Sequence, residues 1–160
     1  MTLPSSWNPL VSTSANLCFP EPLFDRATVL CRTKRDELDN PKNPKNSPFK
    51  RYVDLWMLSL IVGRSSSQFL PSSPQKKFID GSIFQGDMSR ISIILSIVYL
   101  HEGKDSAAIE SANSILAIAN GYVAGGLPLV LESIENGPSS SIENLFQALI
   151  DKEIVSDSFS

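Results

Sequence analysis

The chain has 160 residues, of which 42% are apolar and 19% are charged, and its formal net charge is -3. These values fit one globular domain and exclude wholesale disorder. One histidine and two cysteines are too few for a disulfide framework or for a zinc site built from Cys and His.

Two apolar stretches, 53–62 and 91–100, are each about ten residues long, whereas a membrane-spanning helix needs about 20. The first residues also lack the basic start and the apolar run of a secretory signal. We therefore expect a cytoplasmic protein with no membrane association.

The N-terminal third carries most of the proline. Residues 1–25 show no helical period and are rich in Pro, Ser and Asn, which predicts an irregular arm that could dock through apolar side chains such as Trp7 and Phe19. Residues 27–31 form a short β-prone run that could be one strand or part of a hairpin. The segment DNPKNPKN at 39–46 predicts a stiff, exposed linker, because proline disfavours helix at the residue before it.

Helical patterns begin after this linker. Ser47 and Pro48 supply a start and Gly63 a stop for a helix over 48–62. Residues 64–86 are expected to form a polar loop with a partly ordered stretch, KKFIDGSIF. A helix over 87–103 is apolar nearly all round, which predicts a central, buried position.

Three more helices are expected in the C-terminal half. One starts at Asp105 and ends at Gly121 or at the pair Gly125 and Gly126, and a short one follows from Pro128 to the turn Asn136-Gly137-Pro138. The spacing of Ser140 and Glu143 is that of a capping box, which predicts a last helix to about Ile154.

The predicted fold is therefore mainly α: a compact bundle of about five helices, with one short N-terminal strand or hairpin as an option. The expected organisation is an irregular arm over 1–25, a single helical domain over 26–155 and a loose tail over 156–160. Short connections favour antiparallel packing of neighbouring helices.

Charge is unevenly distributed along the chain. Residues 26–90 hold 12 basic side chains against six acidic ones, and residues 91–160 hold two against nine. The basic region could meet nucleic acid or an acidic protein, or the two halves could simply face each other. The candidates for nucleic-acid contact are Arg32, Lys34, Arg35, Lys50, Arg51, Lys76 and Lys77.

No pattern of catalytic residues stands out. His101 with Glu102 could act as a base and its partner, but a histidine at this place is more simply explained by the exposed carbonyls of a helix end. Cys18 and Cys31 are expected to be packed thiols. The glycines at 121, 125 and 126 lack the spacing of a phosphate-binding loop. The sequence predicts no enzyme, no cofactor and no metal.

Two stretches, SPFKRYVDLWMLSLIVG at 47–63 and ANGYVAGGL at 119–127, resemble a family of small proteins found with DNA phosphorothioation genes and called dnd system-associated protein 4. The helix over 87–103 falls in a compatible place, and the resemblance covers roughly residues 26–155. It implies an accessory component of bacterial antiviral defence, coupled to sulfur modification of DNA. It supplies no catalytic residues.

The hypothesis with the most support is a non-catalytic accessory or adaptor protein of a bacterial DNA modification–restriction (phage defence) system. It would bind protein partners of the same system and, as a further option, double-stranded DNA. The alternatives are a structural or regulatory interaction module unrelated to DNA, and a small hydrolase centred on His101.

Overall fold

The computed structural model describes residues 10, 12–32, 45–101, 103, 109, 111–137 and 139–157. The protein is mainly α, as predicted, with one short two-stranded sheet among the described residues. In chain order the elements are β1 Asn16–Pro20, η1 Glu21–Leu23, α1 Phe24–Val29, α3 Tyr52–Ser65, β2 Gln75–Asp80, η2 Gly81–Phe84, α4 Met88–His101, α5 Ala112–Glu135 and α6 Ser141–Asp157.

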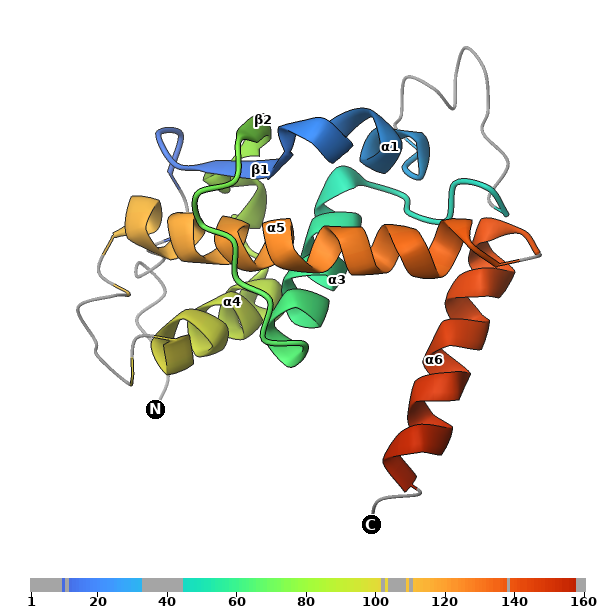
Figure 1. Ribbon diagram of the computed structural model, residues 1–160. Helices are drawn as coiled ribbons and strands as arrows, with labels where there is room; N and C mark the ends of the chain where they lie inside the picture. Colours follow the sequence, from blue (N-terminus) through green and yellow to red (C-terminus); the bar gives the residue numbers. More distant parts are fainter. Residues whose placement is uncertain are drawn as a thin grey trace.

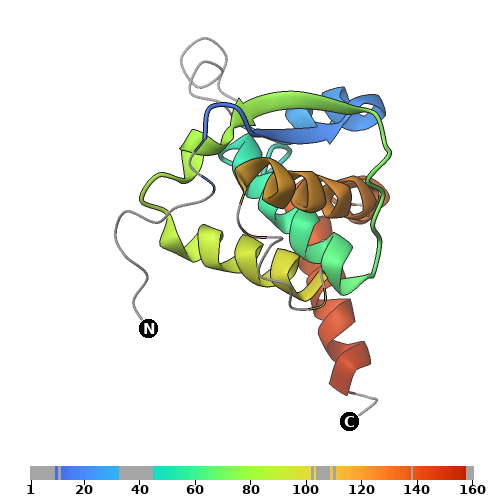
Figure 2. The same ribbon diagram turned by 90° about the vertical axis from the view of Figure 1, so that its left-hand side faces the viewer.

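The elements form a helical bundle around α5 (Figure 1). Helix α5 runs through the middle and α3 crosses it, while the sheet and α1 lie on one side of this central pair. Helices α4 and α6 lie on the opposite side, and the perpendicular view shows the same order (Figure 2). Two outer layers therefore enclose one central pair of helices.

The sheet joins two segments that are far apart in the sequence. Strand β1 pairs with β2 in antiparallel register, with Phe19 opposite Lys76 and an irregularity between Leu17 and Cys18. Leu17 and Phe19 are completely buried. The prediction of an irregular arm is therefore wrong for residues 16–25, because burial of these two side chains holds the segment in regular structure. Residues 1–9 lie outside the described part.

The β-prone run at 27–31 is not a strand. Residues up to Val29 belong to helix α1, whose Thr28 hydroxyl donates to the carbonyl of Asp25 at 3.0 Å. Only Cys31 makes a bridge, in parallel orientation with Phe49. The intrinsic preference of Val and Thr for strands is weak, and the packing of Ala27 against the core overrides it.

Helix α3 starts later than predicted, at Tyr52. The backbone N–H of Arg51 donates to Asp54 Oδ2 at 3.1 Å, which satisfies one group at the helix start. Ser47 does not cap this helix, because its hydroxyl donates to the carbonyl of Val29 at 2.8 Å. Gly63 does not end the helix either, since α3 continues to Ser65.

The two helices predicted on either side of the glycines are one continuous helix, α5. Gly121, Gly125 and Gly126 are buried inside it, and Pro128 lies inside it with its ring exposed. The glycines therefore do not end a helix. A Cβ on Gly126 would lie 1.9 Å from the carbonyl oxygen of Ser59 and 2.5 Å from the nitrogen of Gly63. The backbones of α3 and α5 approach so closely that only glycine fits.

A side chain accepts from a backbone N–H at the start of α5 and at the start of α6. Ser111 caps α5 by accepting from the N–H of Ser114 at 3.3 Å, while the predicted start at Asp105 lies outside the described residues. At the start of α6, Glu143 accepts from the N–H of Ser140 at 3.2 Å, which is one of the two bonds of the predicted capping box. The reciprocal bond is not made, because the buried hydroxyl of Ser140 has no hydrogen-bond partner. Helix α6 runs to Asp157, so residues 156 and 157, expected in a loose tail, are helical.

Helix α4 begins and ends as predicted but is not central. Asp87 accepts from the N–H of Arg90 at 3.2 Å, and Gly103 follows the helix with a φ of +65°. Ile91, Ile94, Ile97 and Val98 face the core. The opposite side is exposed, because the position that the sequence suggested for α4 is occupied by α5.

Helix α5 is long and apolar enough to cross a membrane by length and composition. It has 24 residues, and 72% of its most apolar window is buried inside the protein. A buried core helix passes the same test. The core draws its largest buried side chains from all layers: Trp56, Phe19, Phe84, Leu10, Leu17, Leu55, Leu60, Ile91, Ile94, Ile115, Leu116 and Leu127.

Candidate binding surfaces

A buried amide connects the sheet with both central helices. Asn120 on α5 is 5% exposed, and its Oδ1 accepts from Trp56 Nε1 and from the backbone N–H of Cys18, both at 3.0 Å. Its Nδ2 donates to the carbonyl of Asn16 at 2.9 Å. All of these bonds lie within the protein, so Asn120 organises the fold rather than a binding site.

The two cysteines are packed thiols, as predicted. Burial raises the pKa of Cys18, and the positive charge of Lys77 partly offsets this. A thiol with a raised pKa is a poor nucleophile at neutral pH. Cys31 is buried, and its thiol donates to the carbonyl of Ala27 at 3.5 Å.

His101 takes part in an aromatic cluster at the ends of two helices. Its Nδ1 lies 2.7 Å from the hydroxyl of Tyr122, which also accepts from Arg64 Nη1 at 3.5 Å. The ring of Phe69 lies 4.5 Å from that of His101 and 4.8 Å from that of Tyr122. Arg64 is in the last turn of α3 and His101 in the last turn of α4. Both basic groups thus lie where helix carbonyls are exposed.

Metal ligands do not gather in the described residues, where no group of three or more His, Cys, Asp or Glu side chains could hold an ion. The His101 cluster brings together one histidine, one arginine and one tyrosine without a carboxylate among its described contacts. What this arrangement does in the structure is to anchor the ends of α3 and α4 on α5.

The basic residues predicted to meet nucleic acid are only partly brought together. Lys34 and Arg35 lie outside the described part, and Arg32 is half-buried. Lys50 and Arg51 are exposed just before α3, whereas Lys76 and Lys77 are exposed on β2. The ring of Tyr52 contacts that of Phe78 edge-on at 5.8 Å, so the start of α3 and strand β2 lie side by side.

Several of these cations already have partners. Arg51 lies 3.5 Å from Asp54, and the amine of Lys76 lies 4.3 Å from the ring centre of Phe24. Arg26 on α1 pairs with Glu135 on α5 at 2.5 Å, which joins the basic and acidic parts of the chain. Part of the charge asymmetry is therefore neutralised by contacts within the fold. This agrees with the alternative that the basic and acidic parts of the chain face each other.

A small ion-pair network lies at the start of α4. Arg90 contacts Asp87 at 2.5 Å and Asp54 at 2.6 Å. The hydrogen bond from Arg90 is the main cause that lowers the pKa of Asp87. The network ties α3 to α4 and pairs Arg90 with two carboxylates.

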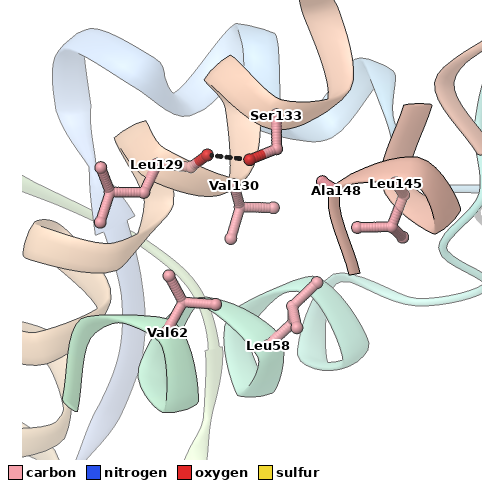
Figure 3. Close-up of a pocket in the computed structure, with 7 residues that line it drawn as sticks. All are labelled: Leu58, Val62, Leu129, Val130, Ser133, Leu145 and Ala148. Carbon is pink, nitrogen blue, oxygen red and sulfur yellow. Dashed lines mark hydrogen bonds between the residues drawn. The ribbon is translucent and has the colours of Figure 1, made fainter. Parts of the chain in front are cut away.

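A shallow apolar groove lies between three helices (Figure 3). Helix α3 contributes Leu58 and Val62, helix α5 contributes Leu129, Val130 and Ser133, and helix α6 contributes Leu145 and Ala148. The Ser133 hydroxyl donates to the Leu129 carbonyl at 2.9 Å, so even this side chain offers no unsatisfied donor. The hollow holds about 30 Å³, far less than the roughly 300 Å³ of a small-molecule site.

The position of α6, which forms one wall of this groove, is set by Asn144. Its Nδ2 donates to the carbonyls of Ile134 at 2.7 Å and Ser139 at 3.0 Å, and its Oδ1 accepts from the N–H of Ser139 at 3.1 Å. Beyond this joint α6 extends away from the body (Figure 1). Phe146 on α6 is 60% exposed. The apolar spacing of Ile142, Leu145, Phe146, Leu149 and Ile150 predicts that Phe146 lies on the packing face of this helix, and its exposure corrects that prediction.

The exposed side of α4 is a second apolar surface. Eight large apolar side chains are exposed in the described part of the chain, and four of them are Met88, Ile93, Tyr99 and Leu100 on this helix. The sequence missed both surfaces because an apolar side chain looks the same whether the fold covers it or not. The only available signal was that α4 and α6 carry more apolar residues than one packed face needs.

A scan of protein-family models finds no match to this chain, and neither does a search of curated proteins or of solved structures.

Proposed function

We propose that this protein is a non-catalytic accessory protein of a bacterial DNA modification–restriction system, and that it acts in the cytoplasm by binding a protein partner in the groove between α3, α5 and α6. The observation that carries the proposal is the groove itself, an apolar hollow too small for a metabolite. Helix α6, which forms one wall of the groove, also carries the exposed Phe146. Exposed apolar surface of this kind is typical of protein–protein contact. The link to DNA modification rests on the resemblance of residues 47–63 and 119–127.

Charge indicates which partner would fit. Glu132 on α5 and Asp151 on α6 are exposed, and each lies three residues after a groove residue on the same helix, so both flank the groove. Residues 91–160 carry a large excess of acidic side chains. An amphipathic helix with a leucine-rich face and basic flanks would therefore complement this groove.

The test is co-purification of the tagged full chain with the proteins encoded beside it. We expect a complex with a DNA-modifying or DNA-cleaving protein. Ala148→Glu should weaken that complex at least tenfold, because it places a charge in the hollow. Ala117→Glu is the matched control, because it makes the same substitution at an exposed position of α5 outside the groove and should leave binding unchanged. No complex with any such protein, or equal binding by both variants, would contradict the proposal.

Direct DNA contact is a second candidate, favoured by the closeness of the start of α3 to β2. Lys50 is two residues before Tyr52 and Lys77 is one residue before Phe78, and the rings of Tyr52 and Phe78 are in contact. A salt titration with duplex DNA tests it. If both lysines contact phosphates, replacing them with Ala should reduce the slope of log K against log salt by about 2. An absence of binding at low salt would exclude DNA as a direct partner.

A further inference from the structure

The two edges of the sheet differ in what they contact. On β1, the N–H of Cys18 and the carbonyl of Asn16 bond to the side chain of Asn120 on α5. Strand β1 therefore lies between α5 and β2, which is the outer strand in Figure 2. In the described part of the chain no further strand pairs with β2. The residues at the start of β2 are all exposed: Gln75, Lys76 and Lys77.

The backbone of Gln75 points away from β1. In an antiparallel pair, alternate residues bond to the partner strand and the residues between them point away from it. The N–H of Glu21 donates to the carbonyl of Pro74 at 2.8 Å. Gln75 is opposite Pro20 in the register, so this pair lies between two bonded positions.

The backbone of Lys77 points away from β1 as well. Its partner in the register is Cys18, whose N–H donates to Asn120 and not to β2. Neither Gln75 nor Lys77 makes a backbone hydrogen bond outside the sheet to another described residue. The start of β2 thus presents the N–H and C=O groups of two residues at its outer edge.

The two lysines on this edge face opposite sides of the sheet. Lys76 lies opposite the buried Phe19, and its amine lies 4.3 Å from the centre of the Phe24 ring. Successive side chains of a strand point to opposite faces, so Lys77 points to the outer face. A strand added at this edge would place two adjacent residues beside the lysines, one on each face. Opposite charges at such cross-strand positions stabilise pairing, and like charges oppose it.

Charge and backbone together select the occupant of the edge. A second copy that paired through the same residues 75–77 would set lysine against lysine, which is how edge strands avoid self-association. A DNA duplex would contact the lysines through its phosphates. Phosphates only accept hydrogen bonds, so the carbonyls of Gln75 and Lys77 would gain no partner. An extended peptide with two adjacent acidic residues complements both the charges and the backbone groups.

We infer that the outer edge of β2 binds an extended, acidic segment of a partner protein, which adds a third strand to the sheet. The backbone of this segment exchanges hydrogen bonds with Gln75 and Lys77, and its acidic pair lies beside Lys76 and Lys77.

This edge is separate from the site of the proposed function. Neither β1 nor β2 contributes a residue to the groove between α3, α5 and α6. The inference therefore goes beyond the proposed function, and either of them can fail without the other.

Fluorescence anisotropy of the full chain with a labelled peptide, Thr-Val-Thr-Glu-Glu-Val-Thr, tests the inference. We expect saturable binding, and exchange of the two glutamates for lysines should weaken it at least tenfold. Two further peptides carry N-methyl groups on their odd or on their even residues, with the charge unchanged. Because alternate N–H groups of an added strand point at β2, one of them should lose binding at least tenfold and the other should retain it. An absence of saturable binding, or equal binding by both N-methylated peptides, would overturn the inference.

Charge reversal on the protein gives the complementary test. The double variant Lys76→Glu and Lys77→Glu should bind the acidic peptide at least tenfold more weakly and bind the lysine peptide instead, which a misfolded chain would not do. Lys45→Glu is the matched control, because Lys45 is exposed at the start of α6, where its carbonyl accepts from the N–H of Ile142. This variant should bind the acidic peptide as the wild type does. If the double variant loses duplex DNA but gains no affinity for the lysine peptide, the lysines serve DNA and the inference is wrong.

Amide hydrogen exchange locates the added strand on the protein. Binding of the acidic peptide should slow exchange at Gln75 and Lys77, whose N–H groups point outward. Exchange at Lys76, whose N–H points at β1, should change little. Unchanged exchange at both Gln75 and Lys77 in the presence of saturating peptide would show that no strand is added at this edge.

Discussion

The central pair of helices and the two outer helices use apolar residues in different ways. Where α3 crosses α5, the backbones touch at Gly63 and Gly126, and the buried amide of Asn120 is bonded on both its atoms. On α4 and α6, large apolar side chains such as Leu100 and Phe146 remain exposed. The comparison teaches that the centre determines the fold, whereas the outer helices retain apolar surface beyond what folding needs.

The largest expected effect comes from breaking the polar connection in the centre. Asn120→Ala leaves the buried N–H groups of Trp56 and Cys18 without their acceptor. We expect the free energy of unfolding to fall by about 4 kcal/mol, measured by urea denaturation followed by tryptophan fluorescence. Asn113→Ala, at an exposed position on the same helix, is the control and should change stability by less than about 0.5 kcal/mol. Equal losses would show that Asn120 is not the connection between sheet and helices.

A somewhat smaller loss is expected where the two backbones cross. Gly126→Ala adds a methyl group that meets the backbone of Ser59 and Gly63, so α3 and α5 must move apart at a cost of about 3 kcal/mol. Gly86→Ala separates this steric effect from backbone strain. Gly86 has a φ of +77° and open space around its Cβ position, so alanine there should cost only about 1 kcal/mol. Thermal and urea unfolding of both variants provides the comparison, and a smaller loss at Gly126 than at Gly86 would disprove the close crossing.

The smallest effect is expected in the ion pairs that hold α4. Arg90→Ala removes the contacts with Asp87 and Asp54 and should cost about 1 kcal/mol at pH 7, because partly exposed pairs are screened by water. The pKa of Asp87 is lowered in the folded state. The stability that ionised Asp87 contributes is therefore fully present above the ordinary pKa of an aspartate. It is lost as the pH falls through the lowered pKa of Asp87 in the folded protein.

The stability difference between wild type and Arg90→Ala should accordingly shrink below about pH 4. Unfolding curves between neutral pH and pH 2 measure it. If the difference were as large as that of Asn120→Ala, the outer helices would determine the fold as strongly as the centre.

The starts of helices were predictable where a side chain bonds to the local backbone. The sequence predicted the start of α4 at residue 87 and the start of α6 from the spacing of Ser140 and Glu143. In both cases a carboxylate bonds to a backbone N–H three residues away. The start of α3 was not predictable, because Ser47 bonds to Val29, which the sequence does not place near it. Strand β1 was missed for the same reason: its partner β2 is more than 50 residues away.

The candidate surfaces were less predictable than the fold. Lys50 and Lys77 were named among the basic candidates from the sequence, but how they lie relative to each other depends on the packing of α3 against β2, which includes the contact between Tyr52 and Phe78. The groove depends on where Asn144 sets α6, and the outer side of α4 is exposed only because α5 fills the centre.

The sequence by itself determined that this chain is mainly helical, since the apolar period and the capping residues are local properties. Only the tertiary structure decided that the glycine-rich and proline-containing segment is one buried helix and that the most uniformly apolar helix lies at the surface. The physical reason is close packing: the glycines let α5 approach α3 backbone to backbone, and burial at that crossing outweighs the local tendency of Gly and Pro to end a helix.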